Sequence, residues 1–258
     1  QFIWNQWVVK EILNTSLVDY FSSDDVKISQ EKYEKINSLI LHLLENKPIQ
    51  YFFGYMYFKN IKLSIDSNVL IPRPETEQLV DLVVDYLGNK KEHAIIDIGT
   101  GSGCISVALK KSIPNDILGV DVCINALNIA KSNAQFNNVK MDFQLLDILK
   151  PESYRSLPKF DVIVSNPPYV LMSEVSSSSN IHCEPSSAIF VSDKNPLLFY
   201  EAICVFSKTK LSKNGKIFFE INPNLVSELH KMLLKYFMND IKICEDFYGK
   251  KRFIVVSS

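Results

Sequence analysis

The segment VSNPPYV, residues 164–170, follows the apolar run FDVIV and carries residues that could hold a nitrogen atom in place. Two consecutive prolines restrict the backbone, so the side chain of Asn166 and the carbonyl group of Pro167 become rigid hydrogen-bond acceptors. Such acceptors suit the hydrogens of an amine or an amide. The same residues also suit a plain turn that ends a strand, and this segment alone does not separate the two interpretations.

A glycine-rich segment, DIGTGSG at residues 97–103, connects a predicted buried strand, HAIIDI, to a predicted helix. Glycines let the chain turn sharply and approach a ligand closely, and the start of a helix offers free N–H donors. Packing alone does not need so many alternate glycines, so we expect a ligand here. A dinucleotide is disfavoured because its fingerprint needs a glycine where this chain has Cys104. The residues expected to contact the ligand are Asp97, Gly99, Thr100, Gly101, Ser102 and Gly103.

Two acidic residues lie at the ends of the next two predicted strands, where a nucleoside can be bound. Asp121 closes DILGVDV, and a carboxylate in this position of the sheet can accept hydrogen bonds from both hydroxyl groups of a ribose. Asp147 ends MDFQLLD and could lie beside an adenine amino group, although an acidic turn or helix cap explains it nearly as well. Ile148 could pack against the adenine ring.

The pattern of the chain changes twice, which predicts three regions. Residues 1–47 place apolar side chains at helical spacing from residue 2 onward, with a break at SSDD (22–25) and a helix cap at Ser29. Residues 48–73 contain two alternating segments around the turn Lys59-Asn60, which predicts a β-hairpin linker. Residues 74–258 form the predicted catalytic domain.

Strand and helix patterns alternate through this third region, which predicts an α/β fold with a doubly wound, mostly parallel sheet and helices on both faces. The predicted helices are 75–87, 104–112, 124–136, a helix near 196–211, and 225–237. The last two strands, IKICEDF and RFIVVSS, are joined only by YGKK, so they must form a hairpin. We therefore expect one antiparallel edge strand.

Composition limits the possible classes of protein. With 258 residues, of which 47% are hydrophobic, the chain can form one large domain and a small appendage. Lys+Arg 28 against Asp+Glu 29 gives no overall positive charge that would attract nucleic acid or an anionic membrane. The apolar runs are far shorter than the roughly 20 residues that span a bilayer, and no secretory signal is expected. The scattered cysteines and histidines predict reduced thiols and no metal site.

Taken together, the motifs resemble a known class of enzymes. DIGTGSG, the acidic strand end VD and SNPPY have the order and spacing typical of class I S-adenosylmethionine-dependent methyltransferases, and NPPY resembles the version that methylates a nitrogen conjugated to a planar group. LIPRPETEQLVD (70–81), PIQYFFG (48–54) and EPSSAIFVSDKNPLLFY (184–200) are similar to the HemK/PrmC family, the peptide-chain release factor glutamine N5-methyltransferases. The resemblance covers essentially the whole chain, but INPN after Glu220 lacks the glycine that the family pattern has.

The resemblance implies a Rossmann-like sheet, S-adenosylmethionine as cofactor with S-adenosylhomocysteine as product, and the glutamine of the release factor GGQ loop as acceptor. The catalytic segment would be Asn166, Pro167, Pro168 and Tyr169. Asn166 and Pro167 would accept the amide hydrogens, and Tyr169 would pack against the amide and exclude water. Asn166 is expected to contact the cofactor as well. No general base is needed, because the proton can leave the nitrogen after attack.

Further residues are expected near the substrate because of the resemblance. Arg73, Glu75 and Thr76 belong to IPRPETE, although Pro74 and the glutamates also fit ordinary helix capping. Glu184 and the serine-rich stretch before it are expected to cover the pocket. Residues 1–47 are expected to dock the release factor. The protein is expected to be a cytoplasmic monomer that binds neither duplex nucleic acid nor a membrane.

Two alternatives stay open at this point. An adenine-N6 or guanine-N2 methyltransferase acting on RNA or DNA could use NPPY on an exocyclic amine that has been flipped out of its stack. The near-neutral charge and the lack of a separate target-reading domain argue against it. A non-catalytic partner of translation factors could use S-adenosylmethionine only structurally, but the complete set of motifs argues against that.

Overall fold

The computed structural model describes residues 7–22, 28–88, 92–176, 179–237 and 240–258. Backbone contacts divide the chain into two units, Gln1–Phe53 and Gly54–Ser258, and each is described by itself. Three predicted features fall wholly or partly outside the described residues: the helical start at residues 2–6, positions 23–25 of the SSDD break, and positions 177–178 of the serine-rich stretch.

Short helices form the smaller unit, as the apolar spacing predicted. They are the π-helix η1 (Val8–Leu13), α2 (Leu17–Ser22), α3 (Gln30–Leu44) and α4 (Ile49–Phe53). The predicted cap at Ser29 is confirmed, because its side chain accepts a hydrogen bond from the backbone N–H of Lys32 at 3.3 Å. The buried core of this unit contains Ile12, Leu39 and Ile49.

The larger unit begins with the predicted β-hairpin. Strands β1 (Tyr55–Phe58) and β2 (Ile61–Ser64) pair antiparallel on either side of the turn Lys59-Asn60. Lys59 has a φ of 47°, the left-handed value that a tight hairpin turn requires. Its backbone N–H donates to a carboxylate oxygen of Glu77 at 2.6 Å, which ties the hairpin to the first turn of α5 (Pro74–Leu87).

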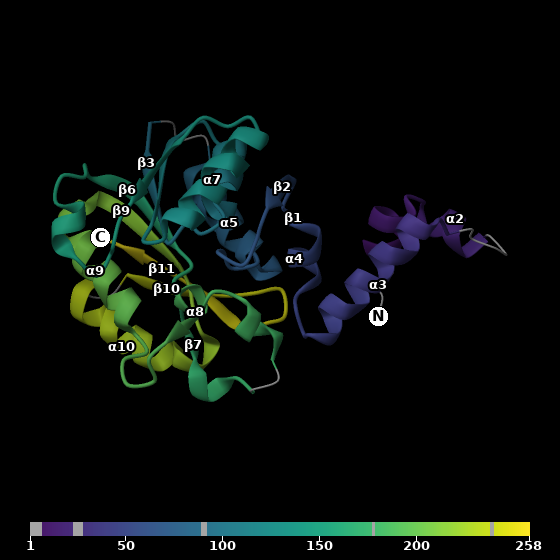
Figure 1. Cartoon of the computed structure of the whole chain (residues 1–258). Coiled ribbons are helices and arrows are strands. Elements are labelled where there is room, and N and C mark those ends of the chain that lie inside the picture. The colour runs from purple at the N-terminus through teal and green to yellow at the C-terminus, as the bar shows by residue number, and fades with distance from the viewer. Residues whose placement is uncertain (1–6, 23–27, 89–91, 177–178, 238–239) are drawn as a thin grey trace. The chain divides into compact units, whose positions relative to one another are not determined.

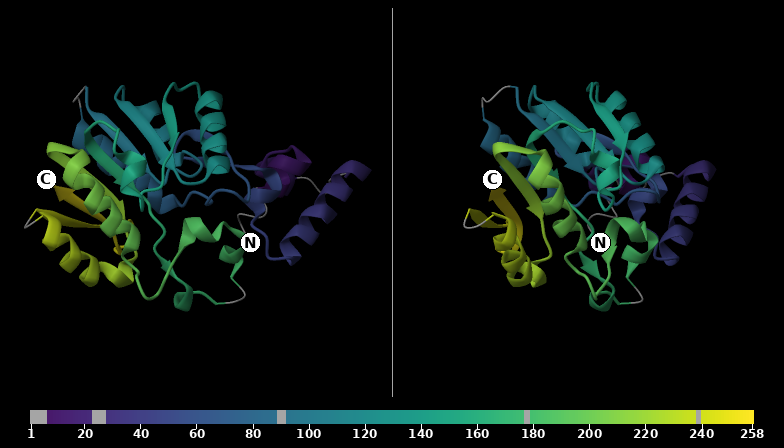
Figure 2. Two further views of the ribbon diagram at one scale, coloured as in Figure 1. Left: turned by 60° about the vertical axis from the view of Figure 1, so that its left-hand side comes forward. Right: turned by 90° about the vertical axis from the view of Figure 1, so that its left-hand side faces the viewer.

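A seven-stranded sheet, counted over the described residues, is the frame of the larger unit (Figures 1 and 2). Its strand order is β10-β11-β9-β6-β3-β4-β5. The strands are β3 (Ala94–Ile98), β4 (Asp116–Asp121), β5 (Asp142–Leu145), β6 (Phe160–Ser165), β9 (Leu211–Glu220), β10 (Ile241–Glu245) and β11 (Lys251–Ser257). Neighbouring strands from β9 to β5 all pair in parallel, which confirms the predicted mostly parallel α/β sheet.

The reversed strand is β11, and it lies one position inside the sheet instead of at the edge where we expected it. β11 pairs antiparallel with both β9 and β10, so β10 occupies the edge and runs in the direction of the main strands. Burial explains this order. β11 contributes the buried side chains of Phe253, Ile254 and Val256, whereas no residue of β10 is fully buried.

Helices cover both faces of the sheet. Figure 1 shows α5 and α7 (Ile124–Phe136) on one side and α9 (Leu198–Lys210) and α10 (Val226–Phe237) on the other, and α6 (Cys104–Ser112) packs beside α5 and α7. The predicted bounds of α6 and α7 are confirmed. Among the described helices, none combines the length and apolar character that crossing a bilayer requires.

The carboxyl ends of the parallel strands meet at one edge of the sheet, because β3, β4, β5, β6 and β9 run in one direction. The glycine-rich segment, Asp121 and the NPPY segment all follow or end these strands. The connection from β6 to β9 also contains the short strands β7 (Val170–Leu171) and β8 (Phe190–Val191), which pair in parallel, and the short helix α8 (Ser186–Ile189). This edge is where ligands bind in open α/β sheets.

Gly119 offers a test of the close packing beneath this edge. It lies in β4 beside Asp97 and Phe143, and a Cβ atom at this position would lie 2.7 Å from the Phe143 ring and 3.1 Å from the Thr100 hydroxyl. Gly119→Ala should therefore lower the free energy of unfolding by about 1–3 kcal/mol, the usual cost of overpacking. Urea unfolding measures this change, and a variant as stable as the wild type would show that the packing is loose.

Candidate active site

A pocket opens at the carboxyl edge of the sheet, among segments that follow different strands. The predicted site residues that line it are Gly99, Gly101, Asp121, Asp147, Ile148, Asn166, Pro167 and Pro168. The predicted residues that do not line it are Asp97, Thr100, Ser102, Gly103, Tyr169, Arg73, Glu75, Thr76 and Glu184. The fold thus brings residues of the two principal motifs to one cavity, while the other predicted residues are not part of its lining.

The glycine-rich segment turns over the end of β3 and leaves space beside it. Gly99 and Gly101 have φ values of 75° and 54°, in the left-handed region that glycine adopts readily. No atom lies within 4 Å of the position that a Cβ would occupy on either residue. The backbone N–H groups of Gly99 and Thr100 both donate to the carbonyl of Val120, at 2.9 Å each, which ties the segment to β4.

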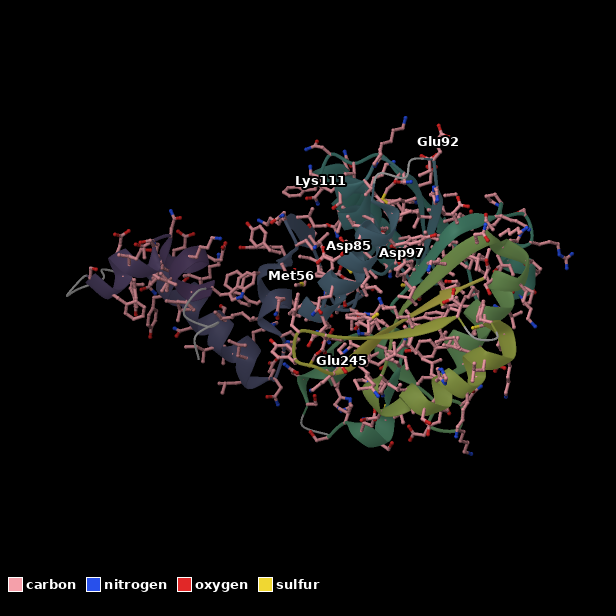
Figure 3. The ribbon with its side chains drawn as sticks, turned by 180° about the vertical axis from the view of Figure 1, so that it is seen from behind. Met56, Asp85, Glu92, Asp97, Lys111 and Glu245 are labelled. Carbon is pink, nitrogen blue, oxygen red and sulfur yellow. The ribbon has the colours of Figure 1, made fainter. Side chains whose placement is uncertain are left out.

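Asp97 is buried inside the larger unit (Figure 3) and holds the start of the glycine-rich segment. Its Oδ2 accepts hydrogen bonds from the Thr100 hydroxyl at 2.6 Å and the backbone N–H of Ser106 at 3.2 Å. Its Oδ1 has no hydrogen-bond partner among the described residues. Burial raises the pKa of this carboxyl group to about 6, although both hydrogen bonds lower it. An unpaired buried carboxylate oxygen is unusual and favours a bound donor or cation.

Asp121 ends β4 and lines the pocket. Its Oδ2 accepts the backbone N–H of Gly101 at 2.8 Å, and its Oδ1 accepts that of Cys123 at 2.9 Å. Burial raises the pKa of this carboxyl group, and the backbone hydrogen bonds lower it. Each oxygen keeps a further lone pair for a ligand, so the carboxylate is held in place to receive adjacent hydroxyl groups.

Asp147 and Ile148 follow β5 and both line the pocket. Asp147 accepts the backbone N–H of Leu149 at 3.0 Å and forms a 3.1 Å ion pair with Lys150. These local bonds match the turn interpretation, while the position in the wall matches the ligand interpretation. Ile148 is half-buried and packs against the main core, so its remaining surface is apolar wall.

The segment after β6 contributes three predicted residues to the wall: Asn166, Pro167 and Pro168. The buried hydroxyl of Ser165 donates to the carbonyl of Ile98 at 2.6 Å, which joins the ends of β6 and β3. The side-chain nitrogen of Asn166 donates to the Thr76 hydroxyl at 3.3 Å. No group in the described part of the chain donates to Asn166 Oδ1, so this acceptor is available to a ligand.

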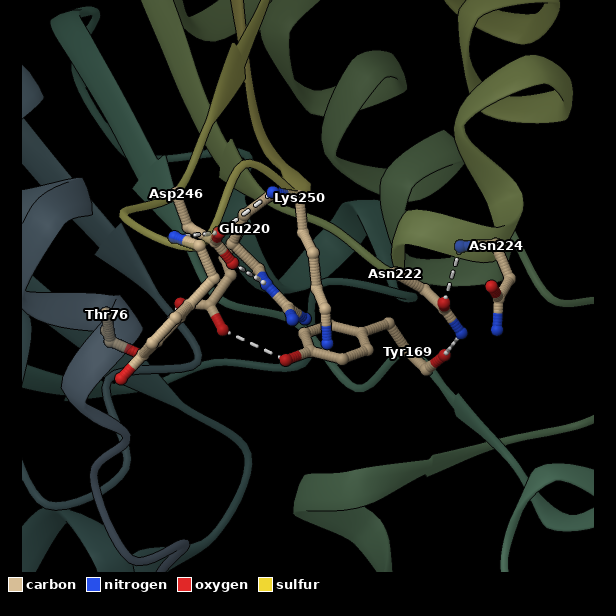
Figure 4. Close-up of polar contacts among 9 residues, drawn as sticks. Thr76, Tyr169, Glu220, Asn222, Asn224, Asp246 and Lys250 are labelled. Atoms are coloured by element: carbon tan, nitrogen blue, oxygen red, sulfur yellow. Dashed lines mark hydrogen bonds and ion pairs between the residues drawn. The ribbon is translucent and has the colours of Figure 1, made fainter.

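Tyr169 is held by polar contacts behind the pocket (Figure 4). Its hydroxyl donates to Glu220 Oε1 at 2.9 Å, and its backbone carbonyl accepts a hydrogen bond from Asn222 Nδ2 at 3.1 Å. Burial and the neighbouring Glu220 carboxylate raise the pKa of Tyr169, so the phenol stays neutral. Asn222 belongs to INPN, the segment that departs from the family pattern, and it also donates to Glu174 at 2.8 Å.

Arg73 and Glu184 form an ion pair of 2.6 Å between two segments that border the site. Glu184 is buried and also accepts the backbone N–H of Ile71 at 2.9 Å. Ser187 and Ala188, which follow in the chain, line the pocket although Glu184 does not. Glu75 lies half-buried in the first turn of α5, and its neighbour Thr76 is buried.

Sequence reasoning missed a large part of the wall. The additional lining residues are Asn68, Val69, Leu70, Ile98, Val120, Val122, Cys123, Ala126, Leu146, Ser165, Ser187, Ala188, Phe199 and Ile203. Val122, Leu146 and Ser165 adjoin predicted strand-end residues, so extending each motif by one position would have found them. Asn68 lies in a segment without a recognised motif, and Phe199 lies in the segment 184–200, which carries the family resemblance but gave no reason to select Phe199. Glu220 was also missed, although it ends the strand beside β6.

The donor set of the pocket fits S-adenosylmethionine. Asp121 offers acceptors for ribose hydroxyls, and Ile148 offers an apolar wall for adenine. The space beside Gly99 and Gly101 leaves room for the rest of the molecule. Across the residues that the structure describes, no cluster of His, Cys, Asp and Glu is placed to hold a metal ion.

Residues 75–181 match the family model described as the methyltransferase small domain. The release factor glutamine methyltransferase of Flavobacterium psychrophilum is 39% identical over 246 residues, which cover 93% of this chain and 86% of that protein. The protein of the same name from Bacteroides thetaiotaomicron is 33% identical over 250 residues, covering 96% of this chain and 89% of that protein. The chain belongs to the release factor glutamine methyltransferase family.

Solved structures agree with this release factor glutamine methyltransferase fold. A methyltransferase from Pyrococcus furiosus has a TM-score of 0.58 at 16% identity and covers 84% of this chain and 96% of its own. The 16S rRNA N2 G1207 methyltransferase of T. thermophilus, in complex with AdoMet and guanosine, has a TM-score of 0.58 at 15% identity and covers 79% and 49%. At these identities the likeness shows the shared fold, a class I methyltransferase sheet.

The raised pKa of Asp97 predicts how the stability of this family member depends on pH. The carboxyl has a pKa of about 6 in the folded chain against an ordinary value of 3.8. Its contribution to stability is therefore complete below pH 3.8 and is lost as pH rises through 6. Asp97→Asn cannot ionise, so its melting temperature, relative to the wild type, should be higher at pH 7 than at pH 4.

Thermal unfolding of the ligand-free proteins at the two pH values measures this difference. Ser102→Ala is the control, because Ser102 is also a buried polar residue of the glycine-rich segment but does not titrate. Its melting temperature should differ from that of the wild type by the same amount at both pH values. If Asp97→Asn behaved like Ser102→Ala, the carboxyl of Asp97 would have no raised pKa.

Proposed function

We propose that this protein transfers a methyl group from S-adenosylmethionine to the N5 atom of the glutamine in the GGQ motif of peptide-chain release factors. Membership of the family supports this substrate class. The position of Asn166 carries the proposal, because its free oxygen lies in one pocket with Gly101 and Asp121. A methyl donor and an acceptor nitrogen can therefore meet there.

The donor would be held by the residues that surround the glycine-rich segment. Asp121 would accept the ribose hydroxyls, Ile148 would pack against the adenine ring, and Asp147 would lie near the adenine amino group. Asp97 would balance the positive charge of the ligand from behind the wall. When bound, S-adenosylmethionine supplies an electrophilic methyl group on a positively charged sulfur atom.

The acceptor nitrogen needs orientation because the lone pair of a glutamine amide is delocalised into its carbonyl group. Asn166 Oδ1 and the Pro167 carbonyl would each accept one amide hydrogen, which aims the lone pair at the methyl carbon. As the new N–C bond forms, the C–S bond breaks and its electron pair stays on sulfur, giving S-adenosylhomocysteine. The nitrogen then releases one proton to water. The two acceptors also favour the positive charge that develops on nitrogen.

The surrounding residues would keep this arrangement rigid and dry. Pro168 would restrict the segment, and Tyr169 would support it from the core and exclude water. The ion pair of Arg73 with Glu184 would hold the covering segment that carries Ser187 against the pocket. Glu75 would lie near the substrate. We expect the enzyme to work as a monomer in the cytoplasm, where release factors act.

A transfer assay with labelled S-adenosylmethionine tests the proposed substrate. Label should enter intact release factor, and mass spectrometry should place the methyl group on the glutamine of GGQ. The alternative acceptor, an exocyclic amine of adenine or guanine, is tested in parallel with RNA and DNA. Label in nucleic acid but not in release factor would contradict the proposal.

We propose that the smaller unit docks the release factor. Its helices expose large apolar side chains, which are typical of protein interaction surfaces: Val18, Phe21, Leu41 and Leu44. Replacing Leu41 and Leu44 with Glu should raise KM for intact release factor by about ten-fold, the effect of losing an interface anchor. The affinity for S-adenosylhomocysteine should not change.

Steady-state kinetics and calorimetry measure these two quantities. Phe136→Ser is the matched control, because Phe136 is 62% exposed but belongs to the larger unit. It should leave KM unchanged. A normal KM for the variant with both glutamates would exclude this surface of α3 from docking.

Asn166→Ala tests the role of the free amide oxygen. Removing an interaction that strengthens in the transition state should lower kcat by about 100-fold and leave the Kd of S-adenosylhomocysteine nearly unchanged. Asn166→Asp keeps an acceptor but adds a charge near the sulfonium, so partial activity is expected. If the segment is only a turn, both variants should lose turnover only in proportion to their loss of folded protein. Kinetics and thermal unfolding on the same samples separate the two results.

A further inference from the structure

Glu220 is a buried acid beside the site with no role in the reaction as described so far. It ends β9 and is 1% exposed. Its Oε2 accepts a hydrogen bond from the Thr76 hydroxyl at 2.7 Å, and its Oε1 accepts one from the Tyr169 hydroxyl at 2.9 Å (Figure 4). Tyr169 belongs to the NPPY segment, and Thr76 is hydrogen-bonded to Asn166 of that segment. Glu220 itself does not line the pocket.

The direction of these two hydrogen bonds follows from the chemistry of the three groups. An ionised carboxylate can only accept, so both hydroxyl groups must donate to it. Burial raises the pKa of Glu220 above its ordinary value, and the hydrogen bonds from Thr76 and Tyr169 and the positive charge of Arg252 limit this rise. Arg252 is itself held by Asp246, at 3.4 Å. The donors and the cation therefore stabilise the ionised form.

The hydrogen bond from Thr76 to Glu220 determines which atom of the Asn166 side-chain amide faces Thr76. A threonine hydroxyl has one hydrogen, and Thr76 gives it to Glu220, so toward any other partner its oxygen can only accept. The partner is the side-chain amide of Asn166, which must then present its nitrogen, at 3.3 Å. The Asn166 oxygen is thereby left without a protein donor in the described part of the chain, as an acceptor for the substrate.

We propose that Glu220 and Thr76 are positioning residues, which fix the orientation of the Asn166 side-chain amide so that its oxygen, and not its nitrogen, is presented to the substrate. The inference rests on the proposed function, because it assumes an acceptor nitrogen that carries hydrogens. In the reversed orientation, the N–H groups of Asn166 would face the N–H groups of the substrate amide, which is repulsive. The hydrogen bonds from Glu220 through Thr76 to Asn166 exclude this reversed orientation before the substrate binds, so the Asn166 side chain needs less ordering during the reaction.

Substitutions of Thr76 separate this role from simple packing. Thr76→Ser keeps the hydroxyl but loses a methyl group, whereas Thr76→Val keeps the volume but loses the hydroxyl. The proposed role predicts that kcat stays close to wild type in Thr76→Ser and falls by about ten-fold or more in Thr76→Val. A packing role predicts the opposite order. Thr76→Ala, also without the hydroxyl, should resemble Thr76→Val in kcat and provides a second test if the valine does not fit.

A double-mutant cycle tests whether Glu220 acts through Thr76. Glu220→Gln alone should lower kcat by about ten-fold, because one of the two hydroxyls then loses its acceptor. In the Thr76→Val background, the side-chain oxygen of Gln at position 220 can still accept the hydrogen bond from the Tyr169 hydroxyl. Little further loss is therefore expected in the double variant, and additive losses would show that Glu220 does not act through Thr76.

Two readouts keep the result independent of overall activity. The affinity for S-adenosylhomocysteine, measured by calorimetry, should stay within about two-fold of wild type in the Thr76 and Glu220 variants, because neither residue lines the pocket. The side-chain amide signals of Asn166 in an NMR spectrum, identified by their absence from Asn166→Asp, should shift in Thr76→Val and stay nearly unchanged in Thr76→Ser.

The possible results distinguish failure of the proposed function from failure of the positioning role. If the wild type does not methylate release factor, the proposed function fails, and the NMR signals still decide the orientation of Asn166. If the wild type is active but Thr76→Val turns over as fast as Thr76→Ser, the positioning role is wrong. Unshifted Asn166 signals in Thr76→Val would overturn it as well.

Discussion

The buried carboxylate of Glu220 holds together parts of the chain that are far apart in sequence. Burying a charge is costly unless hydrogen-bond donors meet it, and the donors to Glu220 come from α5 and from the segment after β6. Asp97 is a second buried carboxyl group, and it meets donors that are near in the chain, Thr100 and Ser106. These polar bonds fix directions that an apolar core leaves free, so the pocket has defined donors and acceptors before any ligand enters.

The principal parts of the fold and pocket could be predicted because they depend on local sequence. Helix α6 follows Gly103 directly and ends just before Ile113 and Pro114, so glycine and proline mark both bounds. The alternation of strands and helices requires a parallel sheet, and a parallel sheet places its strand ends at one edge. The glycine-rich segment and Asn166 therefore had to approach each other, although their separation in the chain is large.

Other features depend on contacts that no local pattern carries. The hydrogen bond from Thr76 to Glu220 spans 144 positions of the chain. Glu220 is the last residue of the apolar strand β9, so in the sequence it resembles an ordinary polar residue that ends a strand. The position of β11 was missed because the hairpin with β10 can add to the sheet by either strand. β11 pairs with β9 because this position buries Phe253 and Ile254 in the core. The hydrogen bond from the Tyr169 hydroxyl to Glu220 is another such contact, while the packing of Tyr169 against the substrate amide stays a prediction.

The central claim is that one pocket holds the methyl donor on Asp121 and presents the oxygen of Asn166 to the acceptor amide. A crystal structure of the protein with S-adenosylhomocysteine and a release factor tests it most directly. The account predicts ribose hydroxyls on the Asp121 carboxylate, and the GGQ glutamine nitrogen within hydrogen-bonding distance of Asn166 Oδ1 and the Pro167 carbonyl. A glutamine bound elsewhere, or one that meets the nitrogen of Asn166, would contradict it.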